Sequence, residues 1–238
     1  LNLKAIEVVE KLIENKKKVI FLTNAPRPCS VVKEYLLNLG MKENLLKNIM
    51  SSGEASMKAL EEERFGKLFF HLGPNKDNEI FKNIKKDKST IDQCDFILCT
   101  GLIEGKEEDL EHHKNLLKKY ISKKLICTNP DLIVHKGEAT QYCAGTIAKL
   151  FESIGGESVY FGKPYKEIYE MCFTHKEKVI AIGDNLNTDI RGANNINVDC
   201  VFISNGVHRS EFKNESELNT LLLKYEVKAS FYQPQLIW

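Results

Sequence analysis

Short apolar runs alternate with amphipathic stretches along most of the chain, and this alternation constrains the fold more than any other feature. The apolar runs end at residues 23, 72, 100, 128, 161, 182 and 203. Between them lie stretches whose apolar residues recur at the three-to-four spacing of a helix. Strands that alternate with helices pair in parallel, because each helix returns the chain to the same edge of the sheet. The sequence therefore predicts an α/β fold with a parallel sheet.

The composition excludes several classes of protein. Seven cysteines, with no Cys-x-x-Cys pair among them, argue against both a disulfide framework and a structural zinc site. A formal net charge of +1 provides no strong field toward nucleic acid or an acidic membrane. No apolar run reaches the ~18 residues that a membrane helix needs, and no signal peptide is visible at the start. We expect a cytoplasmic protein with no nucleic-acid partner and no membrane partner.

Two aspartates follow the most apolar predicted strand, at residues 179–182. Asp184 comes directly after it, and Asp189 opens a predicted helix five residues later. Ligands bind at the carboxyl ends of parallel strands, and Mg²⁺ takes one or two carboxylates. A carboxylate that emerges from a buried strand has little structural reason to be there, so we expect Asp184 to be functional. Asp189 has a plainer alternative, because the helix dipole favours an acid at a helix start.

Two further strand ends carry polar residues that suit phosphate. Thr23 and Asn24 follow the strand predicted at residues 19–23, and a hydroxyl with exposed N–H groups can hold a phosphate oxygen. Lys163 lies in the turn Gly162–Pro164 after another short strand, where a fixed ammonium neutralises a phosphate. Each motif alone has an ordinary alternative: a strand-ending Thr-Asn turn in the first case and a surface lysine in the second.

The order of these motifs is more specific than any one of them. Thr-Asn, then Gly-Lys-Pro, then Gly-Asp-x-x-x-Thr-Asp resembles the second, third and fourth motifs of the haloacid dehalogenase superfamily. The phrases at residues 22–25, 128–131 and 162–164 resemble its NagD and p-nitrophenylphosphatase-type branch. The resemblance implies a Rossmann-like parallel sheet core with an inserted α/β cap. It places the core at residues 1–53 and 158–238 and the cap at residues 54–157, and it allows a homodimer through the cap.

The resemblance also implies roles for the motif residues. Thr23 and Asn24 would hydrogen-bond the transferring phosphoryl group, and Lys163 would neutralise its charge. Asp184 would hold Mg²⁺, with Asp189 supporting the site. The expected function is thus a Mg²⁺-dependent phosphatase that acts on a small phosphorylated metabolite through an aspartyl-phosphate.

Two cap residues complete the expected site. Asn129 and Asp131 flank a proline in the predicted cap loop and would face the leaving group of the substrate. An ordinary Asn-Pro-Asp turn is the alternative.

One motif of the superfamily is absent. Residues 1–238 contain no Asp-x-Asp pair, whereas the family's nucleophile and its acid–base partner lie in such a motif at the end of the first core strand. We therefore expect that the first core strand lies upstream, and that this chain alone is poorly stable and without phosphatase activity. The alternative is an inactive remnant or a phosphate-binding relative. A dinucleotide-binding protein is disfavoured, because no Gly-x-Gly-x-x-Gly follows a strand.

Overall fold

The chain forms two compact units in the computed structural model, which describes residues 1–81, 87–136, 139–174 and 176–238. Unit 1 comprises Leu1–Phe21, Lys33–Ile49 and Lys163–Trp238, and unit 2 comprises Leu22–Val32 and Met50–Gly162. The core and cap boundaries expected at residues 53 and 157 stay a prediction.

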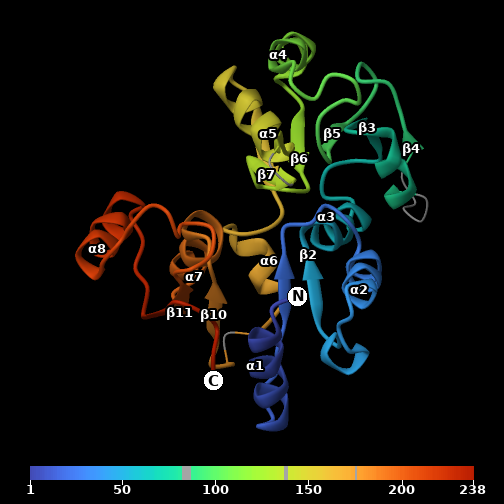
Figure 1. Cartoon of the computed structure of the whole chain (residues 1–238). Helices are drawn as coiled ribbons and strands as arrows, with labels where there is room; N and C mark the ends of the chain where they lie inside the picture. The colour runs from blue at the N-terminus through green and yellow to red at the C-terminus, as the bar shows by residue number, and fades with distance from the viewer. Residues whose placement is uncertain (82–86, 137–138, 175) are drawn as a thin grey trace. The chain divides into compact units, whose positions relative to one another are not determined.

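Unit 1 contains a three-stranded parallel sheet in the order β10 (Ile180–Gly183), β11 (Asp199–Ile203) and β12 (Phe231–Gln233). Its α-helices are α1 (Leu3–Glu14), α6 (Lys166–Glu170), α7 (Arg191–Asn195) and α8 (Glu215–Lys224) (Figure 1). A π-helical turn at Leu186–Ile190 precedes α7, and a 3₁₀ turn lies at Glu43–Leu45. The backbone passes between the units within β1 (Phe21–Thr23), α2 (Cys29–Asn38) and β2 (Ile49–Ser51), and β1 pairs with β2.

Helices α7 and α8 cover one face of the unit 1 sheet. Because side chains alternate between the faces of a strand, Cys200 and Phe202 of β11 point toward these helices and are fully buried. They pack with Ala193 of α7 and with Leu218 and Leu221 of α8. This packing fixes the end of β10 and the loop that follows it.

Unit 2 contains a five-stranded parallel sheet and a separate hairpin. The order is β4 (Asp87–Lys88), β3 (Leu68–Leu72), β5 (Phe96–Cys99), β6 (Lys124–Cys127) and β9 (Glu157–Tyr160). Strands β7 (Ile133–Lys136) and β8 (Ala139–Tyr142) pair antiparallel. The helices are α3 (Ser52–Glu61), α4 (Leu110–Leu117) and α5 (Ala144–Ser153), with 3₁₀ turns at Asn75–Phe81 and Lys118–Tyr120.

The centre of the unit 2 sheet explains its apolar strands. All four residues of β5 are buried, as expected for a parallel strand that is covered on both faces. Helix α5 packs against β5, β6 and β9, and Figure 1 shows it alongside β6. Short polar residues begin the helices: the side chains of Asn2, Ser51 and Asp109 accept hydrogen bonds from the first turns of α1, α3 and α4.

The predicted α/β fold with parallel sheets is confirmed, but several elements differ from expectation. The helix expected to start at Asp189 begins instead as the π-helical turn Leu186–Ile190. The hairpin β7–β8 and strands β4 and β12 were not predicted. Within the described residues, no helix is both long and apolar enough to cross a membrane.

Candidate active-site residues in each unit

In unit 1 the three predicted site residues Lys163, Asp184 and Asp189 lie together at the carboxyl end of β10. The Nζ atom of Lys163 lies 2.6 Å from Oδ1 of Asp189, and the two side chains are 17% and 13% exposed. The other oxygen of Asp189 accepts hydrogen bonds from the backbone N–H groups of Asp184 and Asn185, at 3.2 and 3.1 Å. Asp189 therefore ties Lys163 to the loop that begins at Asp184.

These bonds show which part of the chain the carboxylate of Asp189 holds. A helix-capping acid accepts from N–H groups in the turn that follows it. Asp189 instead accepts from residues 184 and 185, which precede it in the chain. Its carboxylate holds the loop after β10 rather than the start of α7.

The carboxylate of Asp184 is held from one side only. Its Oδ2 atom accepts a hydrogen bond from the N–H of Val207 at 3.1 Å, and no bond to Oδ1 occurs among the described residues. Two glycines leave the space that these two aspartate side chains occupy. A Cβ on Gly206 would collide with the Asp184 carboxylate, and one on Gly183 would collide with the side chain of Asp189.

The donor set of this group fits a hard divalent cation. Across the residues that the structure describes, no three His, Cys, Asp or Glu side chains converge as a metal cage. The group holds two carboxylates, of Asp184 and Asp189, and one ammonium, of Lys163, so its formal charge is negative. Mg²⁺ keeps several of its waters and needs only one or two protein carboxylates. The open Oδ1 of Asp184 is the ligand atom that such an ion would use.

Two neighbours of this group were not predicted from the sequence. Burial raises the pKa of Tyr169, and the charge of Asp189 raises it further, so a neutral phenol lies near this carboxylate. His208 is 3% exposed, and its Nε2 atom lies 3.1 Å from the backbone nitrogen of Leu186, in the loop between Asp184 and Asp189. The one sequence signal for His208 was its place shortly after an apolar strand, five residues beyond the end of β11.

In unit 2, Asn24 and the loop at residues 129–131 contact each other. The Asn24 side-chain amide donates to Oδ1 of Asp131 at 2.9 Å, and Asn24 is 6% exposed. Asn129 accepts from the N–H of Asp131 at 3.0 Å, which closes a turn around Pro130. Burial, followed by the charge of Asp131, raises the pKa of the Cys143 thiol to about 11, so a neutral thiol accompanies this carboxylate.

Close backbone packing surrounds this contact. Gly162 has a φ of +132°, and a Cβ there would lie 2.7 Å from both Pro130 Cδ and Ser52 Oγ and 2.8 Å from Asn24 Oδ1. Thr23 accepts from the N–H of Ala25 at 3.2 Å, so its hydroxyl shapes the turn that carries Asn24. The structure thus joins Asn24 with Asn129 and Asp131 in unit 2, while Lys163, Asp184 and Asp189 lie in unit 1.

Comparison with known families identifies the chain. A haloacid dehalogenase-like hydrolase model matches residues 3–85, and a second model of HAD-hydrolase-like proteins matches residues 160–224. These segments include Thr23, Asn24, Lys163, Asp184 and Asp189. The chain belongs to the haloacid dehalogenase superfamily. The resemblance to this superfamily, which the motif order indicated, is therefore confirmed.

Solved structures of this superfamily share the fold over almost the whole chain. A haloacid dehalogenase-like hydrolase from Brucella suis 1330 is 25% identical, with a TM-score of 0.81 over 98% of this chain and 89% of that one. A p-nitrophenyl phosphatase from Archaeoglobus fulgidus is 21% identical, with a TM-score of 0.75 over 96% of this chain and 87% of that one. The NagD and p-nitrophenylphosphatase-type fold that the resemblance implied is confirmed.

One curated relative matches part of the chain. A dihydroxyacetone phosphatase from Corynebacterium glutamicum (strain R) is 27% identical over 89 residues, which are 35% of this chain. The match covers 32% of the relative, about a third of its length.

Proposed function

We propose that this haloacid dehalogenase-superfamily chain carries the phosphate-binding and metal-binding residues of a magnesium-dependent phosphatase that acts on a small phosphomonoester. The observation that carries the proposal is the Lys163–Asp189 pair at 2.6 Å beside the open carboxylate of Asp184. An ammonium fixed next to a cation site is what phosphoryl transfer needs, because positioning and charge neutralisation supply most of its catalysis.

The proposal gives each residue a task that its contacts support. Lys163, oriented by Asp189, neutralises oxygens of the phosphoryl group. The Thr23 hydroxyl and the backbone N–H of Asn24 donate hydrogen bonds to it, while the Asn24 side-chain amide donates to Asp131. Asp184 holds the metal through Oδ1, and Mg²⁺ supplies positive charge to the phosphoryl oxygens when it is bound. The relatives named as phosphatases favour this reaction over other hydrolyses.

The attacking carboxylate of the aspartyl-phosphate mechanism has no candidate here. Residues 1–238 contain no Asp-x-Asp pair, so the proposal takes the nucleophile from outside them. The same observation favours a second candidate, a relative that binds Mg²⁺ and phosphate without turning over a phosphomonoester. The two candidates share the site and differ only in the chemical step.

Binding and turnover are therefore measured separately. Calorimetric titration with Mg²⁺, then with inorganic phosphate, tests the shared site on the chain of residues 1–238. Hydrolysis of p-nitrophenyl phosphate, with and without Mg²⁺, tests turnover on the same chain and on one preceded by a strand ending in Asp-x-Asp-Gly. Mg²⁺-dependent hydrolysis by the extended chain supports the phosphatase. Binding by both chains with hydrolysis by neither supports the phosphate-binding relative.

A matched pair of variants makes the assignment specific. Asp184→Asn keeps the shape of the side chain but removes its charge, and it should abolish Mg²⁺ binding. Asp199→Asn removes one carboxylate from the amino end of the neighbouring strand β11, where Ser230 contacts it at 2.8 Å, and should leave Mg²⁺ binding intact. Equal binding by Asp184→Asn and the unaltered chain would contradict the proposal.

A further inference from the structure

The loop between Asp184 and Asp189 has a buried backbone donor that its own helix cannot satisfy. Leu186 is fully buried and opens the π-helical turn Leu186–Ile190, so its N–H points away from the intrahelical bonds. A buried N–H without an acceptor is costly, and native structures rarely leave one. Nε2 of His208 accepts this hydrogen bond at 3.1 Å.

The contacts of His208 fix which ring nitrogen carries the proton. A backbone N–H can only donate, so Nε2 must be the unprotonated acceptor and Nδ1 must carry the hydrogen. Nδ1 lies 2.5 Å from Oε1 of Glu211 and donates to it. Glu211 thereby selects the one neutral tautomer of His208 that can accept from Leu186.

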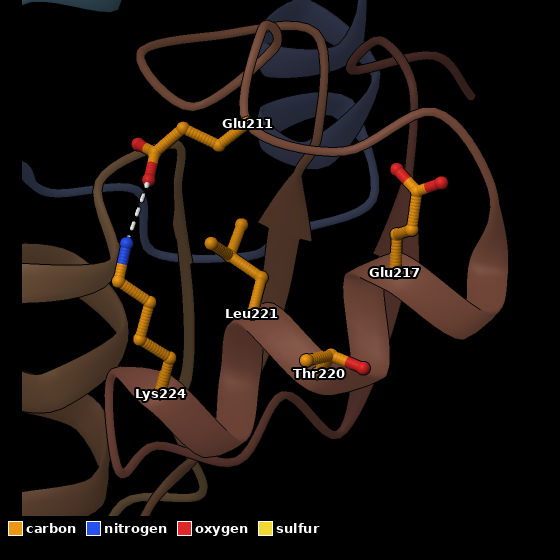
Figure 2. A pocket seen from close by; sticks show the side chains of 5 residues that line it. All are labelled: Glu211, Glu217, Thr220, Leu221 and Lys224. Carbon is orange, nitrogen blue, oxygen red and sulfur yellow. Dashed lines mark ion pairs between the residues drawn. The ribbon is translucent and has the colours of Figure 1, made fainter.

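Glu211 is itself held in place. The hydroxyl of Tyr225 lies 3.2 Å from its Oε2 atom, and Nζ of Lys224 lies 3.9 Å from the same oxygen. Figure 2 shows Glu211 facing Lys224 across a pocket that is also lined by Glu217, Thr220 and Leu221 of α8. The acceptor for His208 is therefore anchored to the end of α8.

The segment that carries His208 contacts the loop a second time. The N–H of Val207 donates to Oδ2 of Asp184. Two preceding residues, Ser204 and Asn205, donate to the carbonyls of Gln233 and Pro234 at 3.0 and 3.1 Å, which attaches the segment to β12. The His208 ring packs edge-on against Tyr225 with a centroid distance of 5.0 Å. The segment of residues 204–208 therefore contacts the loop at two points, Asp184 and Leu186.

We propose that His208 is a positioning residue, which acts with Glu211 to hold the Asp184–Asp189 loop in the geometry that binds a divalent cation. This inference rests on the proposed function, because it takes Asp184 as the metal ligand. His208 touches neither substrate nor metal in this role. It acts through the backbone of Leu186, as outer residues of metal sites do when they orient the ligands.

The unaltered chain provides the first test. Long-range ¹⁵N–¹H NMR of the histidine rings should show Nε2 of His208 unprotonated and Nδ1 protonated, and the Leu186 amide should exchange slowly with solvent. The opposite tautomer, or rapid exchange at Leu186, would overturn the proposal without any variant.

Two substitutions then separate positioning from folding. His208→Phe fills the space but removes the acceptor, so it should speed exchange at Leu186 and weaken Mg²⁺ binding in calorimetry by about tenfold, the lower end for outer residues of metal sites. His208→Gln can place an oxygen near the former Nε2 and should restore part of both. Thr220→Ala, in the same pocket but without contact to the loop, should change neither. Equal Mg²⁺ affinity in all four chains would overturn the proposal.

Mg²⁺ affinity and amide exchange at Leu186 together distinguish failure of this inference from failure of the proposed function. If the unaltered chain binds no Mg²⁺, the metal assignment of Asp184 fails and this inference fails with it. If Mg²⁺ binds and Asp184→Asn abolishes binding, while His208→Phe changes neither affinity nor exchange, only the role of His208 is wrong.

Discussion

At the scale of single residues, the Lys163–Asp189 pair links stability to the site. Lys163→Met would leave Asp189 largely buried, and among the described residues its remaining donors would be the backbone N–H groups of Asp184 and Asn185. Because losing one partner of a buried pair strands the other charge, we expect a loss of about 2 kcal/mol, which is less than for a carboxylate with no remaining partner. Urea unfolding measures this change.

An exposed pair in the same unit is the control. Lys166 and Glu170 lie 2.8 Å apart on α6 with side chains 62% and 49% exposed, so Lys166→Met should change the urea midpoint little. Equal effects of Lys163→Met and Lys166→Met would contradict the structural importance of the buried pair.

His71 in unit 2 gives a prediction about pH. Burial, reinforced by the charge of Lys88, lowers the pKa of His71 from 6.5 to about 4, and its ring contacts Thr100 at 2.9 Å. Between these pH values the unfolded chain binds the proton and the folded chain does not, so this residue makes stability fall as pH falls from about 6.5 toward 4.

The comparison that isolates this effect is His71→Gln. The unaltered chain should lose about 1 kcal/mol more than the variant between pH 7 and pH 5, after allowance for solvent screening. His112→Gln, at an exposed histidine on α4, should keep the pH dependence of the unaltered chain. The measurement is urea unfolding at both pH values, and identical slopes for His71→Gln and the unaltered chain would refute the prediction.

At the scale of elements, β10 is an apolar strand at the edge of its sheet. It pairs with β11 on one side, and the described residues provide no strand on the other. Ile180 and Ile182 point to the face opposite the α7–α8 core and are 50% and 39% exposed. Exposed apolar edges template pairing between chains, so we expect concentration-dependent self-association. Light scattering over a concentration series should detect it.

One lysine at this edge should suppress the association. Ile180→Lys puts a charge on the strand, which is a common protection of natural sheet edges. Leu223→Lys adds the same charge at a leucine that is 78% exposed on α8, and it should leave the association unchanged. If both variants suppress it equally, net charge rather than the edge of β10 is responsible.

Individual strands and turns show how far the sequence predicts the elements of the fold. Strand β3 ends at Leu72, where its apolar run was expected to end, because its apolar content is strong and local. Strand β12 was missed, since its three residues become a strand only through pairing with β11. The π-helical turn was missed for a similar reason. Its start depends on Asp189 and His208, which accept hydrogen bonds from the N–H groups of Asn185 and Leu186. No local sequence pattern predicts a bond between residues 186 and 208.

The candidate site was predictable in its parts but not in its contacts. Motif order singled out Lys163 and Asp184, which each follow a strand, and Asp189, which comes five residues after Asp184. The pairing of Lys163 with Asp189, and of Asn24 with Asp131 across 107 residues, is created by the fold. Polar contacts between distant residues leave no periodic trace in a sequence.

At the scale of the whole molecule, the proposed function draws on residues of both units. Thr23 and Asn24 belong to unit 2, and Lys163 and Asp184 belong to unit 1. If they serve one reaction, we expect phosphate and Mg²⁺ to bind cooperatively, and each ligand then raises the affinity for the other by the same factor. Couplings of this kind usually lie between about 5-fold and 150-fold.

NMR titration with inorganic phosphate measures this coupling at defined residues. With Mg²⁺ present, the amides of Thr23 and Asn24 and those of Gly183 and Asp184 should shift together and give one dissociation constant. Asp184→Asn should weaken the phosphate response at Thr23, although the substitution lies in the other unit, whereas Asp199→Asn should not. If phosphate shifted Thr23 with the same affinity in both variants, the units would bind independently. The proposed coupling of phosphate to Mg²⁺ would then be wrong, while the metal assignment of Asp184 would still have to be judged by its own titration with Mg²⁺.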